Sequence, residues 1–211
     1  NQKPVSDGVP LVSILVPARN ESANITACVE SLLQQSYANF QIIVLNDHST
    51  DDTGSQLDQL ALQYPNLSVI HSDIAPPSGW NGKSYACHRL AQKATGDWLL
   101  FTDADTIHSV QSITLGMTQA DVLKVDFLSA LPRQETKTWS ERLLVPFIMD
   151  FLPLVSWDFQ RIAQGKAKQI AANGQYLLVR AKTYQAVGGH AAIRQALVDD
   201  FALAYHCYRS G

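Results

Sequence analysis

Short apolar runs alternate with segments of helical spacing along the first hundred residues of the chain. The apolar runs lie at 11–17, 40–46, 67–70 and 97–101, and helical faces fall between them at about 25–33, 53–64 and 84–94. Strands that alternate with helices in this way form a parallel sheet covered by helices on both faces. We therefore predict an α/β fold, with a mainly parallel, twisted, Rossmann-like sheet, and a single domain over residues 1–211.

Composition and charge narrow the classes of function. The chain is 46% hydrophobic and 17% charged, which suits one substantial core. Its net charge of -3 and pI near 6.0 provide no overall basic field, so we expect no nucleic-acid partner. Cys28, Cys87 and Cys207 lie far apart, a spacing that predicts buried thiols and neither a zinc motif nor a disulfide framework. No two histidines have ligand spacing, and only His190, beside a Gly-Gly turn, stands out.

Charged residues follow three of the predicted strands, in the segments PARNE, NDHSTDD and TDADT. Parallel α/β sheets bind ligands at the carboxyl ends of their strands. Asp103 and Asp105 are two positions apart, so in an extended segment both can face one point and offer oxygen ligands to a divalent cation. The alternative is that one of them only caps the next helix. Asp51 and Asp52 are expected at a helix N-terminus, where they complement its dipole.

Four segments together resemble the successive motifs of family 2 glycosyltransferases. They read VSILVPARNESANITACVESLLQQSY, IIVLNDHSTDDT, GDWLLFTDADT, and VGGH followed by VDDFALA. The segment PPSGWNGKSYAC is further similar to a bacterial subgroup associated with hopanoid and carotenoid glycosylation, whose members are usually flanked by membrane segments. The resemblance implies a GT-A fold, with inverting, metal-dependent transfer of a sugar from a nucleotide-diphospho-sugar, expected to be a UDP-sugar. It implies Mn²⁺ or Mg²⁺ as cofactor and a lipid or polyisoprenoid-type acceptor at the cytoplasmic face of a bacterial membrane.

The resemblance also assigns a donor site. It places one set of residues against the nucleotide: Pro17, Ala18, Arg19, Glu21, Asp47, Lys83, Asp103 and Ala104. It assigns the metal to Asp105, with Asp103 as the second ligand. Lys83 either neutralises phosphate or is an ordinary solvated lysine. Trp80 either lines the sugar pocket or packs within its loop.

Inverting transfer also requires a base that takes the proton of the acceptor hydroxyl. In the family this base is the Asp of a Glu-Asp pair that follows a Gly-Gly turn. Here the pair reads Asp199-Asp200, so the resemblance assigns Asp200 as the base and leaves Asp199 open as the alternative. Both carboxylates could instead only cap the helix expected at 201–208. The resemblance places three further residues near the acceptor: Asn173, Gly174 and Gly189.

The strongly apolar segment 139–159 is interrupted by Pro146, Asp150 and Pro153. It predicts either an interfacial amphipathic segment that brings the site to a lipid acceptor, or a buried helix pair. The chain starts at Asn1 without Met and stops at Gly211 with no helix cap beyond it. We therefore expect a piece of a longer, membrane-flanked chain, with a nucleotide-binding half at about 10–106 and an acceptor-side half at about 107–211.

Two other functions remain open at this point. The DxD of the run DADT matches the start of the DxDxT pattern of haloacid-dehalogenase-type phosphohydrolases, in which the first Asp is a nucleophile and the motif ends the first strand of the core. A non-catalytic, membrane-associated binding domain is the second alternative.

Overall fold

The computed structural model describes residues 8–134, 136, 138–146, 170 and 172–210. Within them, a six-stranded sheet has the order β3-β2-β1-β4-β6-β5. The strands are β1 Val12–Ala18, β2 Phe40–Asp47, β3 Leu67–Ser72, β4 Trp98–Phe101, β5 Phe127–Ser129 and β6 Leu177–Arg180. The first four strands run parallel, as predicted, whereas β6 is antiparallel to both of its neighbours. The prediction of a mainly parallel α/β sheet is confirmed.

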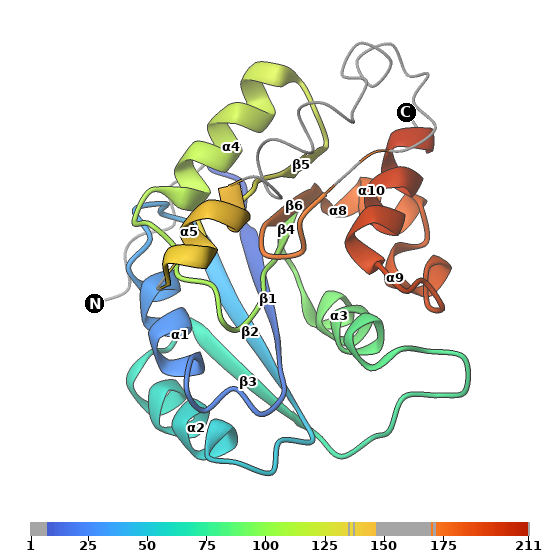
Figure 1. Ribbon diagram of the computed structural model, residues 1–211. Coiled ribbons are helices and arrows are strands. Elements are labelled where there is room, and N and C mark those ends of the chain that lie inside the picture. The colour runs from blue at the N-terminus through green and yellow to red at the C-terminus, as the bar shows by residue number, and fades with distance from the viewer. Residues whose placement is uncertain (1–7, 135, 137, 147–169, 171, 211) are drawn as a thin grey trace.

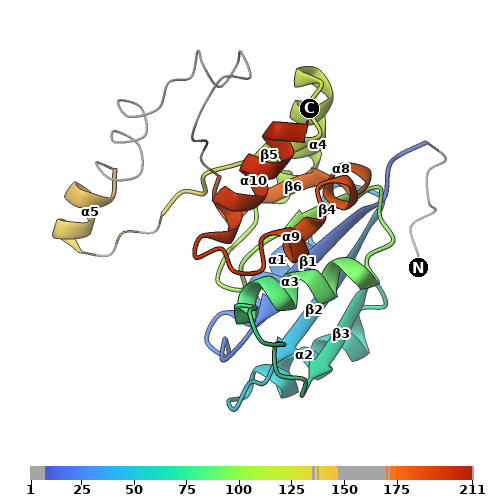
Figure 2. The ribbon, with the colours of Figure 1, turned by 90° about the vertical axis from the view of Figure 1, so that its right-hand side faces the viewer.

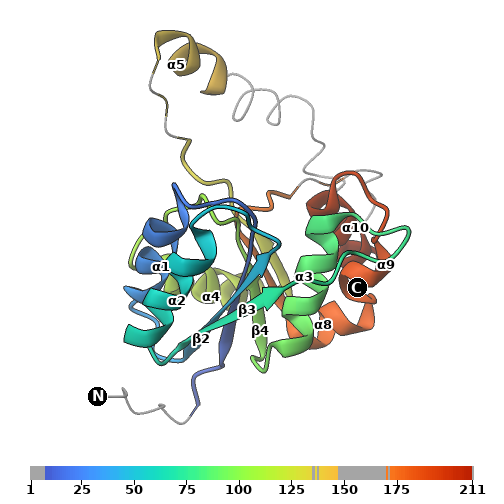
Figure 3. The same ribbon diagram turned by 90° about the horizontal axis from the view of Figure 1, so that it is seen from below.

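Helices connect the strands and cover both faces of the sheet (Figure 1). Their bounds are α1 Ile25–Leu33, α2 Thr53–Gln63, α3 Gly82–Lys93, α4 Ser112–Leu123, α5 Trp139–Pro146, α8 Ala181–Ala186, α9 Gly189–Ala192 and α10 Asp199–Ser210. The three helices expected between the first four strands are therefore present. Figures 1 and 3 show α1, α2 and α4 on one side of the sheet, and α3, α8, α9 and α10 on the other.

Two buried apolar layers follow from the alternation of side chains along each strand. Ile14 and Val16 of β1 face α1 and α2, whereas Leu15 faces the layer that contains α3 and α10. The three cysteines are free and buried, as predicted: Cys28 belongs to the first layer, and Cys87 and Cys207 to the second. The sheet is therefore covered on both faces, as a parallel sheet requires.

The strand order brings distant segments to one edge of the sheet. β1 lies between β2 and β4, so the loops after Ala18, Asp47 and Phe101 emerge side by side. Because β6 is antiparallel to β4, its first residue, Leu177, pairs with the last residue of β4. The segment that precedes β6 therefore reaches the same edge. Parallel α/β sheets bind ligands at such a point, where the strand order reverses.

The apolar segment predicted at 139–159 is described only in part. Helix α5 covers its first eight residues and stands off from the sheet (Figure 2). The side chains of Trp139, Leu143 and Leu144 are exposed, so this part is not a buried helix pair. Residues 147–159 lie outside the described part of the chain. Among the described helices, none has the length and apolar character needed to cross a bilayer.

Candidate functional site

A cavity of about 330 Å³ opens at the carboxyl ends of β1, β2 and β4, beside the start of α3. Its size suits a small-molecule ligand. Its lining residues are Pro17, Ala18, Arg19, Glu21, Asp47, Gly82, Lys83, Ala86, Asp103, Ala104 and Asp105. The structure thus brings together every residue that we assigned to the nucleotide and the metal, and adds Gly82 and Ala86 from α3. We refer to it as the donor cavity.

The loops after β1 and β2 are held together by side-chain hydrogen bonds. The Asn20 N–H donates to Ser49 Oγ (2.9 Å), and Asn20 Oδ1 accepts from the Thr50 N–H (2.8 Å). Asp51 accepts from the Ser22 N–H and from the hydroxyl and N–H of Thr53, the first residue of α2. The bonds from Thr53, followed by those from Ser22, hold the pKa of Asp51 below its usual value. Asp51 therefore joins the two loops at the start of α2 and does not line the cavity.

Asp47 ends β2 at the rim of the donor cavity and is only 8% exposed. Its Oδ1 lies 2.7 Å from Nδ1 of His48, a residue with the left-handed φ of 55°. The unusual backbone at His48 turns the chain directly after the strand and brings the imidazole onto the carboxylate. A carboxylate fixed in this way is a defined acceptor for ligand N–H or O–H groups.

Asp103 and Asp105 have different surroundings within the donor cavity. Asp103 Oδ1 is 2.6 Å from Nζ of Lys83. Burial alone lowers the pKa of Lys83, but the carboxylates of Asp103 and Asp199 outweigh it, and the net shift is upward. Among the described residues, Asp105 has no hydrogen-bond or ion-pair partner. Neither carboxylate caps the next helix, because α4 begins at Ser112 with Gln111 as its N-cap residue.

The start of α3 is tied to the segment before α10. Asn81 caps α3 by accepting the Ser84 N–H (2.7 Å), and its amide donates to the carbonyl of Ala196 (2.9 Å). This cap places Lys83, in the first turn of α3, between Asp103 and Asp199 at the start of α10. Trp80 packs against the rings of Tyr85 and His88 and does not line the donor cavity. Its position matches the loop-packing alternative.

A second, smaller cavity of about 10 Å³ lies next to the donor cavity, and we call it the acceptor-side cavity. The two cavities share Pro17, Lys83 and Asp103. The other residues that line the smaller one are Cys87, Phe101, Thr102, Gly174, Leu177, His190, Asp199 and Asp200. The assigned donor carboxylates and the candidate bases therefore border adjoining spaces, although about a hundred residues separate them in the chain.

The two carboxylates at the start of α10 are held differently. Asp200 accepts the Gly174 N–H at Oδ2 and the Phe201 N–H at Oδ1, both at 2.8 Å. Asp199 is half-buried, and burial raises its pKa, while Lys83 acts in the opposite direction. Asp200 is thus fixed by two backbone donors, whereas Asp199 lies in the field of Lys83.

The backbone conformation of the Gly188-Gly189 turn explains why glycine occupies both positions. Both glycines have a positive φ, and a Cβ on Gly189 would lie 2.5 Å from the ring of Tyr184. Gly189 lines neither of these cavities, and neither does Asn173, which closes a turn by accepting the Gln175 N–H (2.8 Å). Of the three residues assigned near the acceptor, the structure brings only Gly174 to the site.

Sequence reasoning missed several lining residues. Nothing in the sequence around Cys87 or Thr102 indicates that these residues line a functional site. Thr102 nevertheless links β4 to the loop before β6 by donating to the Gln175 carbonyl (2.8 Å). The position of His190 beside the glycine turn did indicate a possible role in the site. It is buried, which lowers its pKa to about 3, and its Nδ1 lies 2.8 Å from the Tyr184 hydroxyl.

Curated relatives match most of the length of this chain. The 4,4'-diaponeurosporenoate glycosyltransferase of Staphylococcus aureus strain RF122 / ET3-1 is 29% identical over 195 residues, which cover 91% of this chain and 50% of that protein. The same enzyme from strain USA300 is 28% identical over the same shares. The chain thus spans about half the length of these curated relatives.

Solved structures show the same fold. A mannosyltransferase from Pyrobaculum calidifontis, in complex with GDP-Man and Mn²⁺, matches with a TM-score of 0.71 at 21% identity, over 94% of this chain and 52% of that one. TarS 1–349 of S. aureus, in complex with UDP-GlcNAc, matches with a TM-score of 0.62 at 18% identity, over 93% and 53%. The predicted GT-A architecture is therefore confirmed.

The motif DADT follows β4 and not the first strand of the sheet, so the topology does not fit the phosphohydrolase alternative. The model of the family described as "Glycosyl transferase family 2" matches residues 13–179, which include β1, β2, β4 and the donor cavity. The chain belongs to glycosyl transferase family 2.

Proposed function

We propose that this chain is the catalytic part of an inverting, metal-dependent glycosyltransferase that moves a sugar from a UDP-sugar to a lipid-type acceptor. One observation carries the proposal. The donor cavity, lined by Asp47, Asp103, Asp105 and Lys83, adjoins the acceptor-side cavity lined by Asp199 and Asp200. A sugar held at the junction of the two cavities would have the nucleotide on one side and a candidate base on the other.

The donor cavity has groups suited to each part of a nucleotide-diphospho-sugar. Asp47 is a fixed acceptor at the rim, able to read the imide N–H of uracil or a ribose hydroxyl. Arg19 and Lys83 are cationic residues of the lining and can neutralise phosphate oxygens. The Lys83 ammonium contacts Asp103, so phosphate would compete with that carboxylate for it.

The carboxylates present fit a hard divalent cation. Asp105 offers a carboxylate without a partner in the described structure, and Asp103 has one oxygen, Oδ2, that Lys83 does not contact. Carboxylate oxygens are the ligands that Mg²⁺ and Mn²⁺ prefer. When bound, the cation would neutralise charge on the leaving diphosphate. The protein's own contribution is to hold both carboxylates at the rim of the same cavity.

The candidate base is Asp200. Inversion requires the acceptor oxygen to attack the anomeric carbon from the face opposite the diphosphate, and a carboxylate on that face takes its proton. The N–H groups of Gly174 and Phe201 orient the Asp200 carboxylate at the acceptor-side cavity. Asp199 is the alternative base, because it lines the same cavity.

Exposed apolar side chains next to these carboxylates support a lipid-type acceptor. Leu197 is 98% exposed and Phe201 is 43% exposed, and with Val198 and Tyr205 they give the start of α10 an apolar surface. Helix α5 adds Trp139 and Leu143. Surfaces of this kind bind membranes or apolar ligands. The S. aureus relatives carry a carotenoid acid in their names, which supports an acceptor of the same class.

The first test is binding of the donor nucleotide. UDP with Mn²⁺ should raise the melting temperature and bind with a measurable heat, whereas inorganic phosphate with Mn²⁺ should not. The Asp105→Asn variant should lose the metal dependence of UDP binding, and Asp121→Asn, on the surface of α4, should keep it. UDP affinity in Asp105→Asn that still depends on metal would refute the metal assignment.

The second test separates an enzyme from a binding module. A panel of UDP-sugars and GDP-sugars should be screened for nucleotide release, with apolar acceptors that carry a hydroxyl or a carboxyl group in detergent. We expect release to depend on both a UDP-sugar and an apolar acceptor. Binding of UDP without transfer to any acceptor of this class would favour the non-catalytic alternative, and faster release with GDP-sugars would correct the nucleotide.

A further inference from the structure

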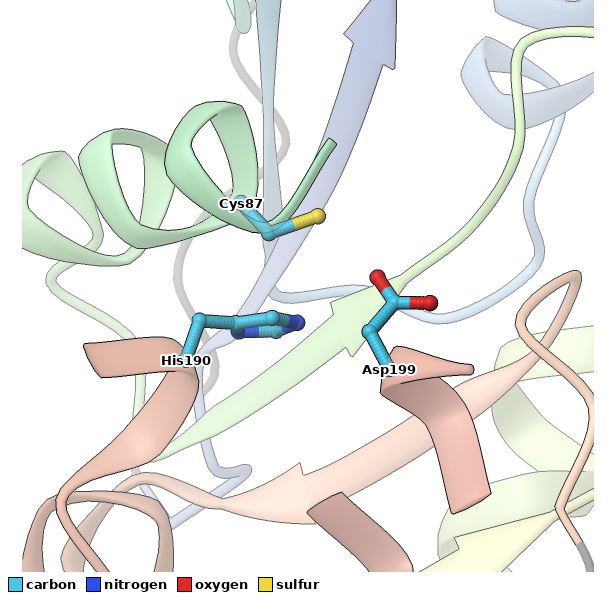
Figure 4. A group of neighbouring side chains, drawn as sticks. All are labelled: Cys87, His190 and Asp199. Carbon is cyan, nitrogen blue, oxygen red and sulfur yellow. The ribbon is translucent and has the colours of Figure 1, made fainter. Parts of the chain in front are cut away.

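Cys87, His190 and Asp199 form a cluster of three potential metal ligands, of which only Asp199, the alternative base, has a role in the reaction proposed above. Their thiol sulfur, an imidazole nitrogen and a carboxylate oxygen all lie within 4.8 Å of one another. Figure 4 shows the three side chains, from α3, α9 and α10, extending toward a common space. Among the described residues, this is the one group of three His, Cys, Asp or Glu side chains close enough to share a cation.

The chemistry of the three ligands is specific. Sulfur, imidazole nitrogen and one carboxylate oxygen together suit a borderline-soft cation such as Zn²⁺, whereas Mg²⁺ and Mn²⁺ prefer oxygen ligands only. Zinc bonds of about 2.0–2.3 Å put the ligand atoms of a tetrahedral site roughly 3.3–3.8 Å apart. The side chains would therefore have to move together by on the order of 1 Å, which is within the range of small rotamer adjustments.

The imidazole of His190 is already oriented for this role. Its Nδ1 lies 2.8 Å from the Tyr184 hydroxyl, which also accepts the backbone N–H of His190. The other ring nitrogen, Nε2, is therefore the one available as a ligand. Metal-binding histidines usually have their second nitrogen fixed by such a hydrogen bond.

The cluster also borders a small space of suitable size. All three residues line the acceptor-side cavity, whose volume of about 10 Å³ is close to the smallest that holds one water molecule. A cation bound by the three side chains would have room for at most a single water as its fourth ligand. Lys83 lines the same cavity, and its positive charge opposes a cation there.

We propose that Cys87, His190 and Asp199 form a site for one divalent cation of the zinc class, separate from the Asp103 and Asp105 carboxylates. Binding releases the Cys87 thiol proton to solvent and joins α3 to α9 and α10. The cation then occupies the cavity beside Asp200. The site itself does not depend on the proposed transferase activity, because its ligands are defined by geometry alone.

The test uses Co²⁺ as a spectroscopic substitute for zinc, with the intact chain under reducing conditions. A cobalt–thiolate bond gives a charge-transfer absorption in the near ultraviolet that oxygen ligands do not produce. We expect this band to saturate at one Co²⁺ per chain and to be lost when Zn²⁺ is added. Absence of the band at millimolar Co²⁺ would overturn the proposal.

Variants locate the cation. Cys87→Ser should remove the band, whereas Cys28→Ser and Cys207→Ser, which alter the other two buried thiols, should leave it unchanged. Asp199→Asn keeps the thiol and should weaken Co²⁺ binding at least tenfold, which provides a test if Cys87→Ser fails to fold. Lys83→Gln should tighten binding, because it removes the opposing charge. A band that survives Cys87→Ser, or an affinity that Asp199→Asn and Lys83→Gln both leave unchanged, would refute the site.

Discussion

Replacing Asp200 by Asn should separate donor binding from transfer. The Asp200 carboxylate accepts one N–H from Gly174 and one from Phe201, and an amide of the same shape has only one oxygen to offer. The variant should therefore lose one hydrogen bond to a charged acceptor, which lowers the free energy of unfolding by about 1.5–3 kcal/mol. If Asp200 is the base, transfer should also fall by ~10²–10⁴-fold, a rise in the barrier of about 3–5 kcal/mol.

Donor affinity should change little in this variant. Asp200 does not line the donor cavity, so the affinity for the UDP-sugar should stay within roughly twofold of the wild type. Calorimetry measures that affinity, single-turnover transfer measures the chemistry, and urea unfolding measures the stability loss. Asp121→Asn, on the exposed surface of α4, controls for the loss of one negative charge elsewhere.

Asp199→Asn is the critical comparison. Asp199 raises the pKa of Lys83, which lines the donor cavity, so removal of its charge should strengthen binding of the diphosphate. If Asp199→Asn abolishes transfer and Asp200→Asn does not, the two roles are exchanged. If neither variant slows transfer and the product keeps the anomeric configuration of the donor, the inverting mechanism is wrong.

Three further predictions concern other parts of the molecule. Asp47→Ala should weaken UDP and uridine alike by roughly 5- to 150-fold, the equivalent of 1–3 kcal/mol for unpaired ligand donors, and an equal loss for pyrophosphate in calorimetry would contradict it. Gly189→Ala should lower the free energy of unfolding by about 2–4 kcal/mol, because its Cβ meets the Tyr184 ring at positive φ. Gly82→Ala, whose Cβ meets nothing within 4 Å, should show no such loss in urea unfolding. His108 is buried and its pKa falls to about 4, so between pH 6.5 and 4.5 the unfolded chain binds a proton that the folded chain does not. Stability should therefore fall by roughly 2–3 kcal/mol over that range, and a slope of stability against pH that is the same in His108→Gln would refute this cause.

Much of the nucleotide half follows from the sequence alone. The strand–helix alternation predicts four parallel strands, because periodicity and turn residues act over short stretches of chain. Once those strands are parallel, their carboxyl ends must share one edge, which places Asp47 and Asp103 together. The meeting of these carboxylates at one edge of the sheet could therefore be predicted from the sequence.

The acceptor side could not be predicted in the same way. The run Leu177–Val179 is uniformly apolar, and nothing in its pattern indicates that it pairs antiparallel to β4. That pairing brings Gly174 to the edge of the sheet, where its N–H holds Asp200. The pairing depends on which buried surfaces complement each other, and such contacts join residues that are far apart in sequence.

Among the polar contacts of the site, the sequence likewise predicts some features, whereas only the tertiary structure decides others. The sequence predicts that Asp103 can offer its oxygens to a cation, but only the tertiary structure identifies the Lys83 ammonium of α3 as its partner at 2.6 Å. Spacing along the chain argues against a zinc motif, because Cys87 lies about a hundred residues from both His190 and Asp199. The folded chain nevertheless brings these three side chains within 4.8 Å of one another, because α3 packs against α9 and α9 against α10 on one face of the sheet. Local periodicity determines which elements form, whereas the packing of those elements decides which side chains meet.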